Sequence, residues 1–215
     1  MKTRHIIWDW NGTLLDDFQI TARITIDALA DLGRAGVTEE DVRHHYQRPL
    51  PDYFSALIGR AVSDHELRHL GDSYVRRYDA AMACLPLAPD ALQALAEIGE
   101  VATQSLLSMA PHEQIVALID QHRLGERFTL VQGFAGTGHP SKRESLAAHC
   151  AALNLPSDRC WLIGDTVDDF DAASALGVRT VLVTTGMQGA AALAATGSPI
   201  AHNLTEAARL IIDAT

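Results

Sequence analysis

Four carboxylates stand within seven residues directly after an apolar segment, and this cluster is the part of the sequence best suited to carry chemistry. The apolar segment covers residues 160–163, and the cluster consists of Asp165, Asp168, Asp169 and Asp171. Carboxylates this close at the end of a buried strand repel one another unless they are solvated, protonated or bound to a cation. A helix N-terminus accounts for Asp168 and Asp169, but not for Asp165 on the strand. The pattern indicates a site for a hard divalent cation, and magnesium binds through one or two carboxylates together with water and phosphate.

A second candidate lies near the N-terminus, where the apolar segment 6–10 carries one acidic residue, Asp9, and breaks at Asn11 and Gly12. Such a run predicts a buried parallel strand with Asp9 at its carboxyl end. Ligands of open α/β sheets bind at that edge. A carboxylate there, followed by a glycine turn and the Thr13 hydroxyl, can act as a nucleophile beside backbone N–H groups suited to an anion. The alternative is a buried strand and turn that serve packing alone.

Two further residues have the chemistry to hold an anion. Ser108 ends a predicted strand just before a helix, where unpaired N–H groups and the helix dipole attract anions. Taken alone, Ser108 can equally be the cap of that helix. Lys142 opens a predicted helix, where the dipole disfavours a cation, and its expected partners are a phosphoryl group and the Asp9 carboxylate. A solvated surface lysine is the alternative, and Arg143 competes for the same role.

The four segments resemble the four motifs of the haloacid dehalogenase-like hydrolase superfamily, in their order and at their usual separations. Residues 9–14 read Asp-Trp-Asn-Gly-Thr-Leu and resemble the first motif, which is an aspartate, any residue, usually a second aspartate, and Gly-Thr-Leu. Ser108 takes the place of the hydroxyl in the second motif, and Lys142 that of the lysine in the third. Residues 164–169 resemble the fourth motif, which is Gly-Asp, any three residues and Asp.

The resemblance implies a role for each matching residue. Asp9 is expected to attack phosphorus and carry the phosphoryl group, with Lys142 as the cation of the site. The residues expected to hold magnesium, the implied cofactor, are Asp9, the backbone carbonyl of Asn11, Asp165 and Asp169, with Asp168 as an outer or alternative ligand. The residues expected to bind phosphate are Ser108, Met109, Lys142 and Gly12. Met109 stands where asparagine is frequent, and Arg143 stands where proline often follows the lysine.

Asn11 is the departure that matters most for mechanism. In the family's phosphatases an aspartate at this position protonates the leaving oxygen and then activates water, and an amide does neither near neutral pH. Losing this help costs about 10²–10⁴-fold for a leaving group that needs protonation.

Three hypotheses follow from Asn11. The first is a phosphohydrolase that is slow or acts on good leaving groups such as acyl phosphates or anhydrides. The second replaces the missing acid with a histidine from the helical region, for which the candidates are His44, His45 and His65. The third is a phospho-ligand-binding protein without turnover. A mutase is disfavoured because phosphate return needs the same acid, and a dehalogenase because that chemistry does not use a metal.

Hydrophobic periodicity predicts two kinds of region. Residues 17–84 show only helical patterns, whereas strands alternate with helices from residue 101 onward. Beyond the segment 6–10, strands are predicted at 101–107, 128–131, 160–163 and 178–184, and a glycine-rich loop at 133–139. The alternation implies right-handed crossovers and a mainly parallel sheet covered on both faces. The predicted fold is α/β, with a Rossmann-like doubly wound parallel sheet (residues 1–16 and 86–215) and an inserted all-helical cap domain (residues 17–85).

Substrate choice is expected to lie with the cap. The loop 47–52 contains two prolines and carries Arg48, which is suited to bind a carboxylate or a second phosphate through two hydrogen bonds. A solvated loop arginine is the alternative. Bending at residues 16–17 and 85–89 would close the cap over the site. A small helical cap resembles that of phosphoglycolate-phosphatase-like members, which implies a small phosphorylated metabolite as the substrate.

Composition disfavours several classes of function. The 215 residues suffice for one α/β core and a modest insertion, and a formal net charge of −10 repels nucleic acids and anionic membranes. Cys84, Cys150 and Cys160 are odd in number and widely spaced, which favours free thiols in a reducing cytoplasm. No segment has the length of a signal-peptide core or a membrane span. The expectation is a cytoplasmic protein, monomeric or homodimeric, that binds neither nucleic acid nor membrane.

Overall fold

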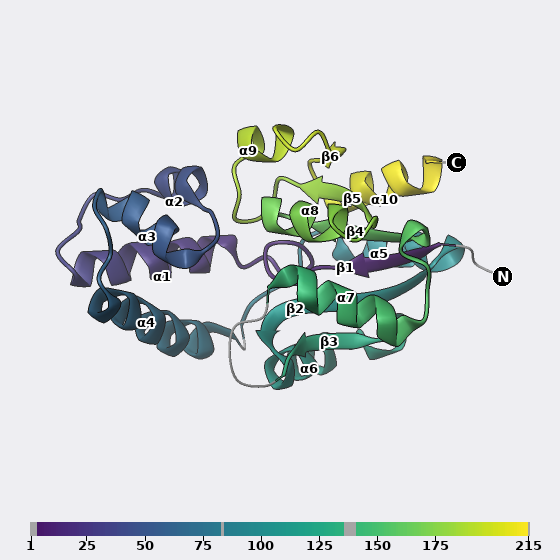
Figure 1. Ribbon diagram of the computed structural model, residues 1–215. Helices are drawn as coiled ribbons and strands as arrows, with labels where there is room; N and C mark the ends of the chain where they lie inside the picture. Colours follow the sequence, from purple (N-terminus) through teal and green to yellow (C-terminus); the bar gives the residue numbers. More distant parts are fainter. Residues whose placement is uncertain (1–3, 83, 136–140, 215) are drawn as a thin grey trace.

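The core of the protein is a six-stranded parallel sheet with the strand order β3-β2-β1-β4-β5-β6 (Figure 1). The computed structural model describes residues 4–82, 84–135 and 141–214. The strands are β1 (His5–Trp8), β2 (Thr103–Pro111), β3 (Val131–Phe134), β4 (Cys160–Gly164), β5 (Arg179–Val183) and β6 (Ile200–Ala201). β1 and β4 are neighbours in the middle of this order, which brings the two acidic segments of the sequence to adjacent strand ends.

Helices cover both faces of the sheet. Ile6 and Trp8 of β1 pack with residues of α5, α6 and α10, whereas Ile7 faces the other way and packs with α7 and α8. The helices of the core are α5 (Ala91–Val101), α6 (His112–Gln121), α7 (Lys142–Leu153), α8 (Val167–Ser174), α9 (Ala190–Ala194) and α10 (Leu204–Asp213). A parallel sheet buried on both faces explains why the central strands are nearly all apolar. The predicted doubly wound α/β fold is confirmed.

Four helices are inserted between β1 and β2. They are α1 (Phe18–Asp31), α2 (Glu39–His45), α3 (Leu50–Ile58) and α4 (Asp64–Met82), and Figure 1 shows them grouped beyond one end of the sheet. Most of their buried apolar side chains, among them Phe18, Leu29 and Leu70, form a hydrophobic cluster separate from the two clusters of the sheet, whereas Ile24 and Tyr78 pack with the sheet. The insertion is all-helical, as predicted. Among the described residues, no helix is both long enough and apolar enough to cross a membrane.

Several predicted boundaries are wrong. β2 continues to Pro111 instead of ending at residue 107, and α5 extends to Val101, where a strand was predicted to begin. α3 starts at Leu50, inside the predicted loop 47–52, because proline is tolerated in the first turn of a helix. The two-residue strand β6 was not predicted, since it is too short to show a hydrophobic period.

The third strand lies three residues later than predicted. β3 covers Val131–Phe134 instead of 128–131 and takes in the first two residues of the predicted glycine-rich loop, whereas residues 136–140 lie outside the described residues. A Cβ atom on Gly133 would come within 2.6 Å of the His112 Cα atom. Glycine at position 133 therefore lets β3 pass close to the start of α6, so its role is in the packing of the sheet.

The unusual polarity of β2 is explained by a buried chain of hydrogen bonds. His5 contacts Thr103 Oγ1 (2.7 Å) and Ser105 Oγ (2.8 Å) through its two ring nitrogens, and Ser105 Oγ also contacts His149 Nε2 at 2.7 Å. His149 continues the chain to Gln132 Oε1 at 2.9 Å. These contacts tie β1, β2, β3 and α7 together. Burial lowers the pKa of His5 to about 4, and that of His149 likewise to about 4.

The two buried histidines predict a stability that falls in acid. Between pH 6.5 and 4 the unfolded chain binds protons on them that the folded chain does not. Their contribution is therefore complete above about pH 6.5 and is lost as the pH falls toward 4, by up to about 1.4 kcal/mol per pH unit for each histidine. Urea unfolding at several pH values should show a shallower loss for His149→Gln than for the parent. The exposed control His65→Gln should match the parent, and equal slopes for all three proteins would contradict the prediction.

Candidate active site

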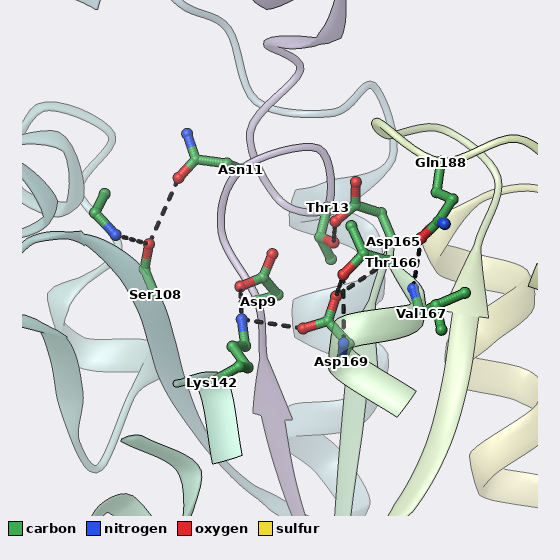
Figure 2. Close-up of polar contacts among 11 residues, drawn as sticks. Asp9, Asn11, Thr13, Ser108, Lys142, Asp165, Thr166, Val167, Asp169 and Gln188 are labelled. Carbon is green, nitrogen blue, oxygen red and sulfur yellow. Dashed lines mark hydrogen bonds and ion pairs between the residues drawn. The ribbon is translucent and has the colours of Figure 1, made fainter. Parts of the chain in front are cut away.

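Three buried carboxylates converge at the carboxyl ends of β1 and β4. Asp9 directly follows β1, Asp165 directly follows β4, and Asp169 lies in the first turn of α8. One oxygen of each lies within 4.8 Å of the others. The backbone N–H of Asp9 donates to the Ile163 carbonyl at 2.9 Å, which fixes the two strand ends to each other. Figure 2 shows the carboxylates gathered above the strand ends, where ligands bind in folds of this class.

Lys142 supplies a positive charge to this group. It is the first residue of α7, only 5% of its side chain is exposed, and its Nζ pairs with Asp9 Oδ1 and with Asp169 Oδ1, the latter at 3.0 Å. Ser141 begins the helix with a reciprocal capping box to Glu144, which fixes where the lysine points. Arg143, the alternative cation, is exposed. The structure thus brings Lys142, and not Arg143, to the carboxylates.

Burial dominates the electrostatics of the cluster. It raises the pKa of Asp9 to about 7, although Lys142 opposes the shift. Burial and the neighbouring carboxylates raise the pKa of Asp165 well above its ordinary value. For Lys142, burial acts to lower the pKa, but Asp169 and Asp9 outweigh it and raise that pKa above its ordinary value. Fully ionised, three carboxylates and one ammonium leave an excess of negative charge, and their oxygens are ligands that magnesium prefers, so the cluster fits a divalent cation.

Hydrogen bonds fix two of the carboxylates. Oδ2 of Asp169 accepts from the Thr166 hydroxyl at 2.6 Å and from the Thr166 N–H at 3.1 Å, which leaves Oδ1 facing Lys142 (Figure 2). Oδ2 of Asp165 accepts from the Met187 N–H at 2.7 Å. The Thr13 hydroxyl lies 3.5 Å from Asp165 Oδ1. Both side chains are thereby held before any ligand arrives.

Glycines allow the backbone to approach Asp165. Gly12 has φ +71°, and a Cβ atom on it would lie 2.4 Å from Asp165 Oδ2, while one on Gly186 would lie 1.9 Å from the same atom. The N–H of Gly12 donates to Asp17 Oδ1 at 2.7 Å. The Gly12 N–H is thus engaged within the protein, and phosphate binding by Gly12 stays a prediction.

Ser108 lies beside the cluster, but in a different local setting from the predicted one. It is buried within β2, which continues past it to Pro111, and α6 then begins at His112. Its hydroxyl accepts from the Ala110 N–H at 3.1 Å and lies 3.5 Å from Asn11 Oδ1 (Figure 2). Met109 follows it, half-buried. Ser108 therefore does not cap the helix, and its hydroxyl faces the first motif.

Asn11 is held by two residues that the sequence did not single out as site residues. Its Nδ2 donates to Asp17 Oδ2 at 2.7 Å and lies 2.6 Å from the Tyr78 hydroxyl, which itself donates to Asp17 Oδ2 at 2.7 Å. Burial raises the pKa of Asp17, and its bonds from Asn11, Tyr78 and Gly12 oppose the shift. Tyr78 belongs to α4 and lies 67 residues from Asn11 in the chain, so no local pattern could have paired them.

Arg48 lies on the helical side, close enough to the fourth motif to interact with its charges. Partial burial acts to lower the pKa of Arg48, but Tyr46, Asp168 and Asp169 together raise it. Asp168 is half-buried, and burial and Asp169 raise its pKa while Arg48 lowers it. An arginine of the insertion whose charge interacts with Asp168 and Asp169 is suited to meet a second anionic group on a ligand.

The three candidate histidines lie elsewhere. His44 and His45 pack edge to face on α2 with their ring centroids 4.9 Å apart, and His65 is exposed in the first turn of α4. No contact within the described ranges joins them to the carboxylates. The arrangement gives no support to a histidine as the missing acid.

Known proteins share this sequence pattern. A family model described as HAD-hydrolase-like matches residues 137–207. The phosphoglycolate phosphatase of Pseudomonas fluorescens (strain Pf0-1) is 28% identical over 98% of this chain and 76% of its own length. The phosphoglycolate phosphatase of Synechococcus elongatus is 27% identical over 84% of each chain.

Solved structures share the fold. A haloacid dehalogenase-like family protein from Streptococcus pneumoniae has a TM-score of 0.82 at 20% identity, covering 98% of this chain and 100% of its own. A hydrolase from Pseudomonas syringae has a TM-score of 0.79 at 15% identity, covering 99% of both chains. At these identities the likeness establishes the fold alone.

The placement of Lys142 predicts an unequal effect of two neighbouring substitutions. Lys142→Met removes the ammonium from among buried carboxylates, and breaking a buried pair costs about 3–5 kcal/mol because it leaves charge uncompensated. The free energy of unfolding in urea at pH 8 with chelator should fall by that order. Arg143→Met, which changes an exposed residue, should stay within about 0.5 kcal/mol of the parent. Similar losses for the two variants would contradict the assignment of Lys142.

Proposed function

We propose that this chain is a haloacid dehalogenase-like hydrolase and acts as a magnesium-dependent phosphatase, which transfers the phosphoryl group of a small metabolite to Asp9 and then to water; the sequence relatives and the shared fold support this. The observation that supports this most is the buried group of Asp9, Asp165, Asp169 and Lys142 at adjacent strand ends. A carboxylate held by an ammonium beside a cation site is arranged for nucleophilic attack on a phosphate.

Each residue of the group has a part in the proposed mechanism. Lys142 holds Oδ1 of Asp9, so we assign the attack on phosphorus to Oδ2. Lys142 and the Ser108 hydroxyl bind the oxygens of the transferring group. Magnesium would be held by Asp9, Asp165, Asp169 and the Asn11 carbonyl, and it supplies positive charge that offsets the repulsion between carboxylates and phosphate. Thr166 and the Met187 N–H keep the carboxylates in place throughout.

Asn11 restricts the leaving group. A carboxamide cannot protonate an alkoxide as it departs, and that help is worth about 10²–10⁴-fold. Acyl phosphates and anhydrides leave without it, and they are the substrates that this site should turn over fastest. Asn11 also favours a second candidate function, a phospho-ligand-binding protein of the same fold without turnover.

We propose that residues 17–85 act as a cap that selects the substrate. Two chain segments connect it to the core side by side: the Asp16 N–H donates to the Pro86 carbonyl at 2.9 Å, and the Ala88 N–H donates to the Leu14 carbonyl at 2.8 Å. Closure by bending there would bring Arg48 over the bound phosphate. The relatives are phosphoglycolate phosphatases by name. A small phosphate that also carries a carboxylate, which Arg48 can bind through two hydrogen bonds, is therefore the substrate class to test first.

The proposed function predicts magnesium-dependent release of phosphate from acetyl phosphate. Chelator should abolish release, and Asp9→Asn should lower kcat by at least about 10³-fold, because it removes the nucleophile. The matched control is Asp171→Asn, an exposed carboxylate of the same acidic segment, which should stay near the parent. If the parent bound phosphate with magnesium but released none from acetyl phosphate, the binding-protein function would replace the phosphatase.

The role proposed for Arg48 predicts a selective loss. Arg48→Gln should raise the KM for phosphoglycolate by about 10–100-fold, since a hydrogen bond to a charged group is worth about 1.5–3 kcal/mol. If phosphoglycolate turns over too slowly for its KM to be measured, its inhibition constant in acetyl phosphate hydrolysis can be compared between Arg48→Gln and the parent instead, and the same ratio is expected. The KM for acetyl phosphate, which has no carboxylate, should change little. Arg68→Gln, an exposed arginine of the same insertion, is the control, and an equal loss for both substrates would contradict a carboxylate-binding role.

A further inference from the structure

We infer that Asp17 and Tyr78 are positioning residues that set the orientation of the Asn11 carboxamide in the site. This inference rests on the proposed function, in which Asn11 borders the reacting phosphate. It concerns a carboxylate and a phenol that lie outside the four motifs and that the mechanism above leaves unused.

Asp17 is enclosed and fully engaged with the first motif. Its side chain is buried just before α1. Oδ1 accepts from the Gly12 N–H at 2.7 Å, and Oδ2 accepts from Asn11 Nδ2 and from the Tyr78 hydroxyl, both at 2.7 Å. Both oxygens of one carboxylate are thus committed to residues 11 and 12 and to helix α4.

These contacts decide which end of the amide faces the site. Asp17 Oδ2 presents an acceptor to residue 11, so the amide group that meets it is the donor, Nδ2. Oδ1 of Asn11 must then point the other way, toward the Ser108 hydroxyl at 3.5 Å, as Figure 2 shows. An oxygen held there can accept a hydrogen bond from a water that attacks the phosphoryl group on Asp9. Orienting a nucleophile in this way speeds a reaction without any proton transfer by the amide itself.

Tyr78 connects this orientation to the cap. Its hydroxyl reaches Asn11 and Asp17 from α4, and its ring stacks on Tyr74 with centroids 5.3 Å apart. The Tyr74 hydroxyl lies 3.4 Å from Thr21 Oγ1 on α1. In the structure α4 therefore lies where Tyr78 and Asp17 both contact the Asn11 amide. A movement of α4 away from the first motif would release one of its two partners.

The pair also explains why an aspartate does not suit position 11 in this chain. A carboxylate in place of Asn11 would lie against the buried Asp17 carboxylate, at the 2.7 Å separation that the amide now bridges as a donor. Two like charges in contact in a buried site repel strongly. The Asn11 amide and the Asp17 carboxylate therefore depend on each other. Exchanging them, by Asn11→Asp together with Asp17→Asn, should restore the hydrogen bond that Asn11→Asp alone breaks.

The first test is a double-mutant cycle on unfolding, carried out in chelator so that it depends on neither magnesium nor turnover. Asn11→Asp should lower Tm by about 5–10 °C, and adding Asp17→Asn should recover at least half of that loss. The control combines Asn11→Asp with Asp16→Asn, which changes the adjacent, exposed carboxylate and should recover nothing. Additive shifts in the Asp17 cycle would overturn the inference.

The second test separates positioning from packing by kinetics on acetyl phosphate. Tyr78→Phe and Asp17→Asn should each lower kcat by about 10-fold with little change in KM, because binding is kept while the orientation of Asn11 is lost. Tyr74→Phe, which removes a neighbouring hydroxyl, and Asp16→Asn should stay within about 2-fold. Equal losses in Tyr78→Phe and Tyr74→Phe would overturn the inference. If the parent releases no phosphate at all, the proposed function fails, and the unfolding cycle alone decides whether Asp17 holds Asn11.

Discussion

The burial of three carboxylates around one ammonium is the constraint on which the rest of this structure depends. Such a group is costly to take out of water, and it persists only when ion pairs and hydrogen bonds compensate the buried charges. The partners come from distant parts of the chain: Lys142 from the start of α7, Thr166 from the start of α8, and the Met187 N–H from the loop after β5. They meet because β1 and β4 are adjacent parallel strands. The strand order is therefore a requirement of the site as much as a property of the fold.

The loop after β5 links that cluster to the helical insertion. Met187 donates its N–H to Asp165, and Gln188 accepts from the Val167 N–H at 2.6 Å while donating to the Tyr46 carbonyl at 3.1 Å. Arg43 of α2 donates to the carbonyls of residues 184 and 185 at 3.3 and 3.2 Å. One short segment thus contacts both a site carboxylate and the cap. The position of the insertion and the geometry of Asp165 are consequently coupled, and a ligand that favours one cap position acts on both.

Local patterns were sufficient for what lies at strand ends and helix starts. An apolar run that ends in an acidic residue located Asp9 and Asp165, and an unfavourable lysine at a helix start indicated Lys142 but left Arg143 as an alternative, because these signals lie within a few residues of sequence. The end of β2, the register of β3 and the strand β6 were missed, because they depend on pairing with neighbours instead of on a period. The polar side chains of β2 have their partners on other elements, such as His5 and His149, which a local pattern does not show.

The same limit applies to Asn11. Within the motif it is a loss of charge, since an amide stands where a carboxylate is usual. In the structure a carboxylate is present six residues later, on Asp17, and it contacts the amide directly. A second carboxylate at position 11 would add to a region that already holds Asp9, Asp165 and Asp169, with Lys142 as the cation paired to two of them. The amide is therefore the residue that lets Asp17 be buried there. The role of Asn11 depends on its contacts with Asp17 and with Tyr78 of α4, and the sequence motif alone does not show these contacts.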